Sequence, residues 1–265
     1  MITRPVVSVS MKKSRITADI FIPLAFIILI LAGWEYIVRL RSIPDWLLPG
    51  PAQIVRTLVD NAPLIIKHTQ STLIECLAGF AVAILFSFIV AFLMDEIALL
   101  RKALYPLIVA SQTIPIVSVA PLFIIWFGYG MLPKIIVVVL VCFFPVAISL
   151  LSGLAAVDND YLELFRSMQA SRLKTFRMVK LPLSMPSFFA GLRISAAYSV
   201  MGAVIGEWLG AKQGLGTYMT LAQRSFQIDR VFAAILAVTV LSAALFLLVS
   251  LVERLVIPWN RLGEK

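Results

Sequence analysis

The sequence is poor in charge, histidine and cysteine, and each shortage excludes a class of protein. Charged residues make up 14% of the chain, against about 25% in a typical soluble domain, whereas hydrophobic residues reach 61%. A single histidine, His68, cannot form a metal site alone, and no Cys/His cluster accompanies it. Cys76 and Cys142 both lie in apolar runs, which is typical of small buried residues and not of a disulfide scaffold. The composition therefore indicates a polytopic membrane protein.

Motifs that carry enzymatic chemistry are missing as well. The phosphate-binding sequence Gly-x-x-x-x-Gly-Lys-Ser/Thr does not occur, so the chain lacks the common ATP-binding loop. No Ser/His/Asp or Cys/His arrangement can be assembled around one histidine. We therefore expect no catalytic residue, no metal site and no cofactor, and an enzyme embedded in the membrane is disfavoured. The net charge of +9 reports orientation in a membrane and does not indicate a nucleic-acid partner.

Six apolar runs are long enough to cross a bilayer, which requires about 20 mostly apolar residues. The third run is charge-free from residue 103 to residue 133 and is too long for one straight spanning helix. Pro106, Pro115 and Pro121 are expected to kink or break it. The sequence therefore predicts an all-α polytopic membrane protein with six transmembrane helices, at residues 20–40, 71–94, 103–133, 135–157, 187–209 and 231–252.

The distribution of Lys and Arg predicts the topology. With the amino terminus inside, most basic residues fall in the inner segments, as the positive-inside rule requires. This places a tail of residues 1–19, the polar loop of residues 158–186 and a tail of residues 258–265 on the cytoplasmic side of a membrane domain over residues 20–257. Between the first two spans, a helix with one polar face is expected from Ala52 on, lying on the outer surface as a packing element.

Residues 158–186 form the one long polar segment inside the chain. Asp158 and Ser171 are suited to cap two short helices, predicted over residues 161–169 and 172–179, and Pro182 ends the second. Periodicity alone leaves two interpretations of this loop open. Either the loop packs against the bundle, or it docks a soluble partner and passes a movement of that partner into the membrane helices.

A resemblance to a known family bears on this choice. The EAA loop of ABC importer permeases reads Glu-Ala-Ala, three residues, Gly, nine residues, Ile, one residue, Leu-Pro, and residues 163–182 are similar to it without a gap. The sequence departs from the motif at Leu164-Phe165, which replaces Ala-Ala, and at Gln169, which replaces a Gly that would permit positive φ. The resemblance implies that the residues coupling the chain to an ATPase subunit are Glu163, Leu164, Phe165, Arg166, Met168, Gln169, Ala170 and Ser171.

Three further stretches resemble the same family, in order along the chain. Leu48-Pro49-Gly50-Pro51, residues 112–130 and residues 206–216 are similar to permeases of the aliphatic sulfonate, taurine and nitrate group. Residues 202–208 most resemble the branch that transports thiamine precursors of the hydroxymethylpyrimidine type.

The resemblance implies the permease subunit of an ATP-driven ABC importer in a bacterial plasma (inner) membrane, with both termini cytoplasmic. The implied solute is a thiamine-precursor pyrimidine, or an aliphatic sulfonate or nitrate-like anion. The implied partners are two copies of an ABC ATPase subunit that hydrolyses the ATP, an extracytoplasmic solute-binding protein, a second copy of this chain and the lipid bilayer, with no nucleic acid.

Polar residues at membrane depth are the candidates for a translocation path. Ser111, Gln112 and Thr113 precede Pro115 in the third run, and helices broken at membrane depth often mark transport routes. A kink satisfied by a neighbouring helix is the alternative for these four residues. Glu207 ends a charge-free run and is the fifth candidate.

Two more carboxylates, Glu35 and Glu75, are expected near the outer interface, paired with Arg39 or Lys67. Carboxylates within spans also suit an ion-gradient-driven secondary transporter, which is the alternative function. Inverted repeats are expected of that class, and the two halves of this sequence show no self-similarity.

Overall fold

The computed structural model describes the backbone of residues 10–259 and the side chains of residues 21–259. The predicted tails, residues 1–19 and 258–265, lie mostly outside these residues. Everything regular in the described part of the chain is helical. The elements are α1 (Ser10–Leu40), α2 (Pro51–Asp60), α3 (Ala62–Glu96), α4 (Ala98–Ser111), α5 (Ile116–Phe127), α6 (Met131–Ala155), α7 (Asn159–Ser167), α8 (Arg172–Thr175), the π-helix η1 (Phe176–Lys180), α9 (Leu181–Trp208), α10 (Leu215–Arg224) and α11 (Ile228–Val256).

The predicted all-α membrane architecture is confirmed. Five helical stretches among the described residues are long and apolar enough to cross a bilayer: α1 from Phe21 on, α3, α6, the run from α8 through α9, and α11. The sixth candidate is the pair α4 and α5, two apolar helices that meet at an angle of 102°. The third predicted span is therefore a sharp elbow made of two short helices.

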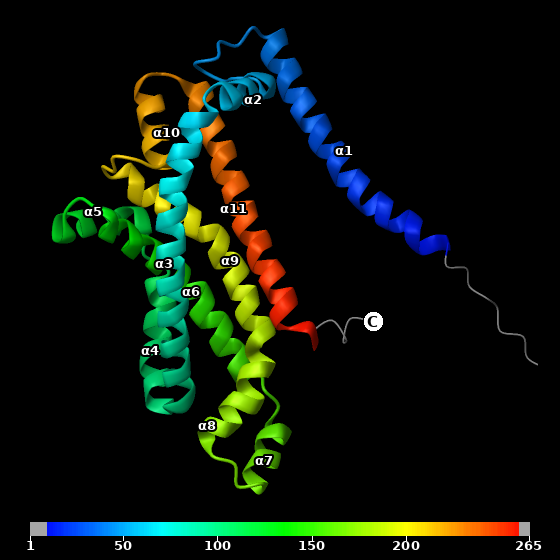
Figure 1. The fold of residues 1–265 in the computed structure, drawn as a ribbon, viewed down its shortest axis with the longest axis vertical. Coiled ribbons are helices and arrows are strands. Elements are labelled where there is room, and N and C mark those ends of the chain that lie inside the picture. Colours follow the sequence, from blue (N-terminus) through cyan, green and yellow to red (C-terminus); the bar gives the residue numbers. More distant parts are fainter. Residues whose placement is uncertain (1–9, 260–265) are drawn as a thin grey trace, which may run out of the picture.

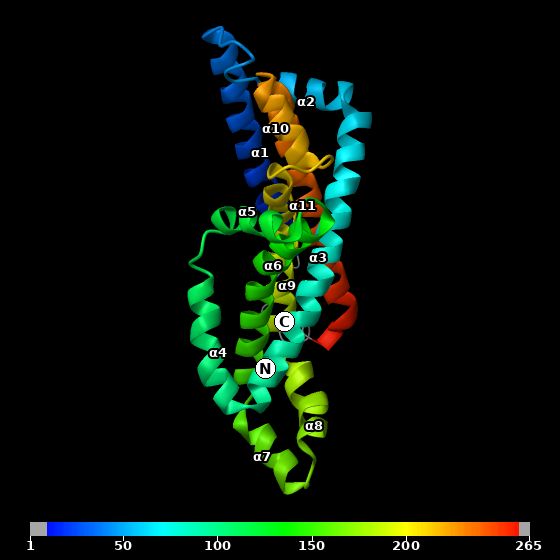
Figure 2. The same cartoon turned by 90° about the vertical axis from the view of Figure 1, so that its left-hand side faces the viewer.

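Pro115 marks the elbow, because it lacks an N–H group and stands in an extended conformation directly before α5. Pro106 and Pro121, which we expected to kink or break the same run, lie inside α4 and α5, and both helices continue through them. One of the three prolines thus lies in the break between the two helices. The elbow lies near the middle of the bundle's length, with α5 crossing in front of α6 and α9 (Figure 2).

The centre of the bundle is the pair α6 and α9, flanked by α3 and α11 (Figure 1). Small residues let the two backbones approach, since a Cβ added at Gly191 would lie 2.7 Å from the carbonyl oxygen of Pro145. Ser195 donates to the carbonyl of Cys142 at 2.9 Å, and the Cys142 thiol donates to the carbonyl of Ser195 at 3.3 Å. Cys142 and Cys76 are free thiols with no exposed surface, as their apolar surroundings predicted.

The bundle has two distinct ends, which we name by the helices there (Figures 1 and 2). The α2–α10 end holds α2, which starts at Pro51 as the sequence predicted to within one residue, and α10. The α7–α8 end holds the polar loop. α1 stands apart from the other long helices and meets them at α2 (Figure 1), where Glu35 accepts hydrogen bonds from Arg39 at 2.6 Å and from the N–H of Ala52 at 3.0 Å.

Ion pairs tie the long helices together toward the α7–α8 end. Lys180 lies 2.8 Å from Asp95 and joins the end of η1 to the last turn of α3. Arg193 lies 2.6 Å from Glu253 and joins α9 to α11. Each pair lies largely out of solvent, and a charge left without its partner there costs several kcal/mol. These contacts fix the position of the loop that precedes α9.

Candidate coupling loop and translocation path

The loop between α6 and α9 consists of two capped helical segments. The Asp158 side chain accepts from the N–H of Asp160 at 3.1 Å at the start of α7, and Ser171 accepts from the N–H of Lys174 at 3.3 Å at the start of α8. α7 begins and ends two residues before the range that the sequence predicted. The second predicted helix divides into α8 and η1, and Pro182 does not end it, because Pro182 lies in the first turn of α9 and the helical run continues through it. The loop forms the tip of the molecule (Figure 2).

The tip presents large apolar side chains that the bundle does not cover. Tyr161 is 52% exposed, Leu164 55% and Met168 68%, and their spacing places them on one side of α7. Phe165 is half-buried beneath them. Glu163 and Arg166 are exposed beside this surface. An apolar surface rimmed by charges and held away from the bundle is typical of a protein interaction site.

The turn after α7 resolves the question raised by Gln169. Gln169 has a φ of 54°, which is the left-handed conformation that glycine would adopt. The N–H of Ala170 donates to the carbonyl of Phe165 at 3.0 Å, and the N–H of Gln169 donates to the carbonyl of Arg166 at 2.9 Å. This pair of bonds forms a Schellman motif with Gln169 at its left-handed position. The turn geometry is therefore kept without the glycine.

The base of the loop is attached firmly to the membrane helices. Phe176 is 4% exposed and packs edge-on against Phe92 of α3, with ring centroids 4.7 Å apart. Val179 is buried, and Lys180 pairs with Asp95. The base of the loop is therefore held against α3 and runs directly on into α9.

The elbow residues meet at a small cavity. Ser111, Gln112 and Ile114 line a space of about 280 Å³ together with residues of α6 and α9. The Ser111 hydroxyl donates to the carbonyl of Ile108 at 2.8 Å, and the Thr113 hydroxyl donates to the carbonyl of Ala110 at 2.7 Å. These two side chains thus satisfy the freed backbone of the break, and Thr113 is absent from the cavity wall. The Gln112 side chain is exposed.

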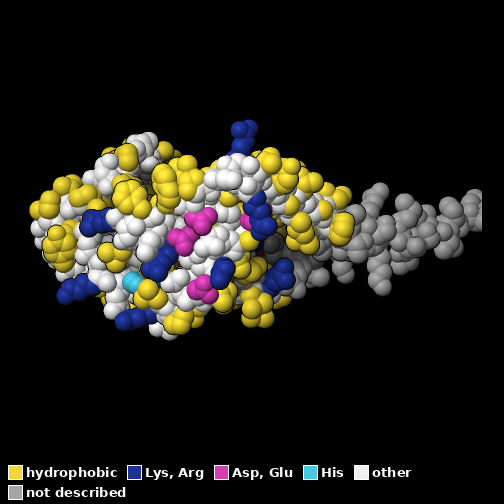
Figure 3. All heavy atoms as spheres, turned by 90° about the horizontal axis from the view of Figure 1, so that it is seen from above, with side chains coloured by type: hydrophobic (Ala, Val, Ile, Leu, Met, Phe, Trp, Pro, Cys, Tyr) yellow, Lys and Arg dark blue, Asp and Glu magenta, His cyan; other side chains and the backbone are white. Residues whose placement is uncertain are grey.

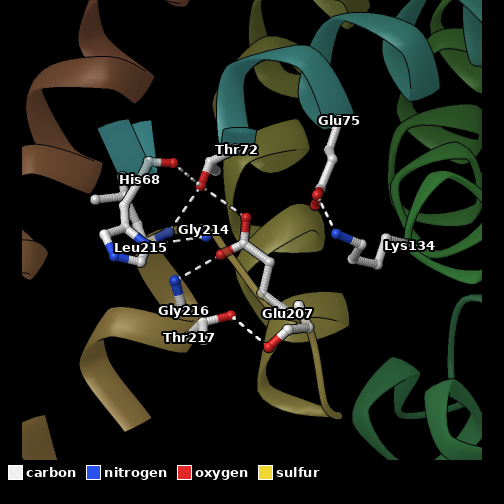
Figure 4. Close-up of polar contacts among 10 residues, drawn as sticks. His68, Thr72, Glu75, Lys134, Glu207, Gly214, Leu215, Gly216 and Thr217 are labelled. Carbon is white, nitrogen blue, oxygen red and sulfur yellow. Dashed lines mark hydrogen bonds and ion pairs between the residues drawn. The ribbon is translucent and has the colours of Figure 1, made fainter. Parts of the chain in front are cut away.

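The structure places Glu207 away from the elbow cavity, in a buried polar network at the α2–α10 end (Figure 4). Its carboxylate is 1% exposed and accepts from the Thr72 hydroxyl at 2.7 Å and from the N–H of Gly216 at 2.6 Å. Thr72 in turn accepts from the N–H of Leu215 at 2.9 Å.

His68 completes the network and has no metal-binding neighbours. Its Nδ1 accepts from the N–H of Gly214 at 3.0 Å (Figure 4). The side chains of α3 and Glu207 together satisfy three successive backbone donors at the start of α10, which would otherwise be orphaned. The described residues include no group of three or more His, Cys, Asp or Glu that could hold a metal.

Glu75 forms an ion pair with Lys134 and not with the expected Lys67 (Figure 4). The pair joins α3 to the first turn of α6. Lys134 also lines a cavity of about 670 Å³ near the α2–α10 end. Glu75 and Lys134 are far apart along the chain, so this pairing was not predicted from the sequence.

The fold and the loop together define a polytopic helical membrane protein with a polar loop that protrudes from one end of the bundle (Figure 2). A family described as "Binding-protein-dependent transport system inner membrane component" matches residues 64–258. The chain belongs to this family and is the permease subunit of an ABC importer for a small solute.

Curated relatives cover nearly the whole chain. Formylaminopyrimidine transport permease protein ThiX of Halalkalibacterium halodurans is 36% identical over 90% of this chain and 96% of its own length. Riboflavin transport system permease protein RibX of Chloroflexus aurantiacus is 33% identical over 88% of each chain. Putative aliphatic sulfonates transport permease protein SsuC of Bacillus subtilis is 30% identical over 89% of this chain and 86% of its own length.

Solved structures share the fold. A chain of an amino acid ABC transporter superposes with a TM-score of 0.61 at 19% identity, over 74% of this chain and 95% of its own. A chain of the MetNI methionine ABC transporter in an inward-facing conformation gives a TM-score of 0.58 at 16% identity, over 73% of this chain and 94% of its own.

Proposed function

We propose that two copies of this chain line a path across a bacterial inner membrane, driven by two ATPase subunits that grip residues 158–182. A solute-binding protein delivers the ligand at the α2–α10 end. Both termini and the α7–α8 end face the cytoplasm, in agreement with the positive-inside rule. ATP is hydrolysed by the separate subunits, since the chain has no phosphate-binding loop.

The observation that carries this proposal is the exposed apolar face of α7 on a firmly attached loop. Tyr161, Leu164 and Met168 remain open to solvent, whereas Phe176 and Lys180 anchor the base. This combination supports a docking surface that passes movement inward, in preference to a loop that packs against the bundle. Glu163 and Arg166 are positioned to form charged contacts at its rim.

The proposed receiving surface for the binding protein is the opposite end of the bundle. Seen from above, that end carries basic and acidic side chains among apolar ones, with the single histidine also visible (Figure 3). Mixed polar surfaces of this kind suit transient association with a soluble protein.

The proposed path includes the elbow residues Ser111, Gln112 and Pro115. Thr113 supports the break between the two helices, and Glu207 holds the start of α10 in place. The names of the relatives suggest two classes of solute. ThiX and RibX are named for nitrogen heterocycles, and SsuC is named for aliphatic sulfonates. We propose a thiamine-precursor pyrimidine or a sulfonate-type anion as the solute of this importer.

Cross-linking tests the docking surface directly. Both native cysteines are fully buried, so single cysteines can be introduced without removing them. Leu164→Cys and Met168→Cys are expected to capture the co-expressed ATPase subunit through a short thiol-reactive linker. Leu255→Cys, 74% exposed near the end of α11, is the matched control and should capture none. Capture equal to that of the control at both loop positions would refute the docking proposal.

A further inference from the structure

The elbow cavity holds polar side chains that the protein itself leaves unpaired. Gln112 lies at the break between α4 and α5, and Tyr198 reaches the same cavity from α9 and is 45% exposed. Ser111 and Thr113 beside them are occupied with backbone carbonyls. Neither the Gln112 amide nor the Tyr198 hydroxyl makes a hydrogen bond to another described side chain or backbone group.

The position of these two groups limits the hydrogen-bond partners that they can find. The elbow lies near the middle of the bundle's length (Figure 2), where a bilayer offers no hydrogen bonds. Gln112 is exposed and Tyr198 is 45% exposed, so both polar groups are open to water or to a polar solute in the cavity.

The rest of the cavity wall is apolar and carries no charge. Phe144 contributes a second aromatic side chain beside Tyr198, and Met201 a flexible thioether. The remaining wall residues are aliphatic or proline, and none of the described residues that line the cavity is Lys, Arg, Asp or Glu: Ile114, Ile116, Leu140, Val141, Pro145 and Ile205. Aromatic faces with a few placed polar groups suit flat, neutral molecules.

An anion is a poor fit for the same wall. An isolated charge placed in an apolar environment loses its hydration, and that loss is repaid only by an opposite charge or several hydrogen bonds. The cavity offers one amide, one phenol and the partly engaged Ser111. The volume of about 280 Å³ lies at the small end of the range of about 300–1,000 Å³ found for small-molecule sites. The space therefore suits a compact solute.

We propose that the elbow cavity is a transit site for a neutral, planar nitrogen heterocycle of single-ring size. The ring lies against Tyr198 and Phe144, and its ring nitrogens or amino group exchange hydrogen bonds with the Gln112 amide. This inference rests on the importer function proposed above and decides between its two solute classes, favouring the pyrimidine over the sulfonate.

Protection from thiol labelling tests the site. Met201→Cys places a thiol in the cavity wall, and Ile194→Cys is the matched control, because both positions on α9 are 48% exposed and only residue 201 lines the cavity. The permease–ATPase complex in lipid nanodiscs is labelled with a maleimide, with and without hydroxymethylpyrimidine or butanesulfonate. At a pyrimidine concentration of ten times its Kd, labelling at 201 should slow about tenfold.

Labelling at the control position and protection by butanesulfonate provide the outcomes that would contradict the proposed site. Labelling at 194 should be unchanged by either probe, and butanesulfonate should not protect 201. Adding Gln112→Leu should weaken the Kd for the pyrimidine by about two- to tenfold, through loss of one hydrogen bond. No protection at 201 by the pyrimidine, equal protection at 194, or protection at 201 by the sulfonate would each overturn the assignment.

Stimulation of ATP hydrolysis by the binding protein tests the proposed importer function separately from the proposed cavity site. The wild-type complex is assayed in parallel with the labelling. Stimulated hydrolysis without protection at 201 overturns the cavity assignment alone. Absence of stimulation refutes the importer function, and the cavity assignment falls with it.

Discussion

Replacing Glu207 should destabilise the α2–α10 end by an amount that depends on which hydrogen bonds survive. Glu207→Leu removes the acceptor for the Thr72 hydroxyl and for the N–H of Gly216, both in a site with almost no solvent access. Each buried donor left unpaired costs about 1–3 kcal/mol. The expected loss in the free energy of unfolding is therefore about 2–6 kcal/mol for Glu207→Leu. Glu207→Gln keeps one acceptor oxygen and should lose about 1–3 kcal/mol.

Thermal unfolding in detergent and hydrogen exchange measure these effects. Exchange at the amides of residues 214–216 should speed up in Glu207→Leu and less in Glu207→Gln, because Glu207 and Thr72 together hold the start of α10. Glu35→Gln is the control, since its carboxylate bonds to Arg39 and Ala52 and not to the network of Glu207, so its loss should leave these amides unchanged. Wild-type stability and wild-type exchange in Glu207→Leu would refute the assigned network.

Three further predictions concern the loop, the core and the topology. Gln169→Gly should stabilise the loop by about 1 kcal/mol, by removing the Cβ penalty of its left-handed conformation, seen as slower hydrogen exchange over residues 165–171. Gly191→Ala should lower the free energy of unfolding by about 1–3 kcal/mol, because its Cβ meets α6, whereas Gly33→Ala, which meets nothing within 4 Å, should be tolerated in the same thermal assay. Lys174→Cys should react with impermeant thiol reagents only from the cytoplasm, and labelling from outside intact cells would contradict the topology.

Composition and charge were sufficient to predict the class of fold. Apolar runs separated by charges located the spanning helices, because the length of each run is set by the bilayer and not by neighbouring helices. The elbow was predicted only in part. Three prolines stand in the third run; Pro115 lies in the break between α4 and α5, while Pro106 and Pro121 are accommodated within helices. Tertiary packing decides which of these prolines breaks the helical run, and this packing cannot be read from the sequence.

The candidate site was likewise predicted only in part from the sequence. The family resemblance, and not periodicity, singled out residues 158–182 as a coupling loop, because its motif is local and continuous; the coupling role stays a prediction. The partners of Glu207 and Glu75 were not predicted, since Thr72 and Lys134 reach them across the bundle. Tyr198 was missed because a tyrosine within an apolar helix carries no distinguishing pattern until the elbow is folded against it.

The most direct test of the account is the affinity of the ATPase subunit for the purified permease. Met168→Glu places a charge at the carboxyl-terminal end of the exposed α7 surface and should raise the Kd by about thirtyfold or more, the loss of about 2 kcal/mol typical of an interface hot spot. Leu255→Glu, equally exposed to solvent but outside the loop, should leave the Kd unchanged. An unchanged Kd in Met168→Glu, with the protein still folded in the membrane, would contradict the claim that this loop couples the permease to its ATPase.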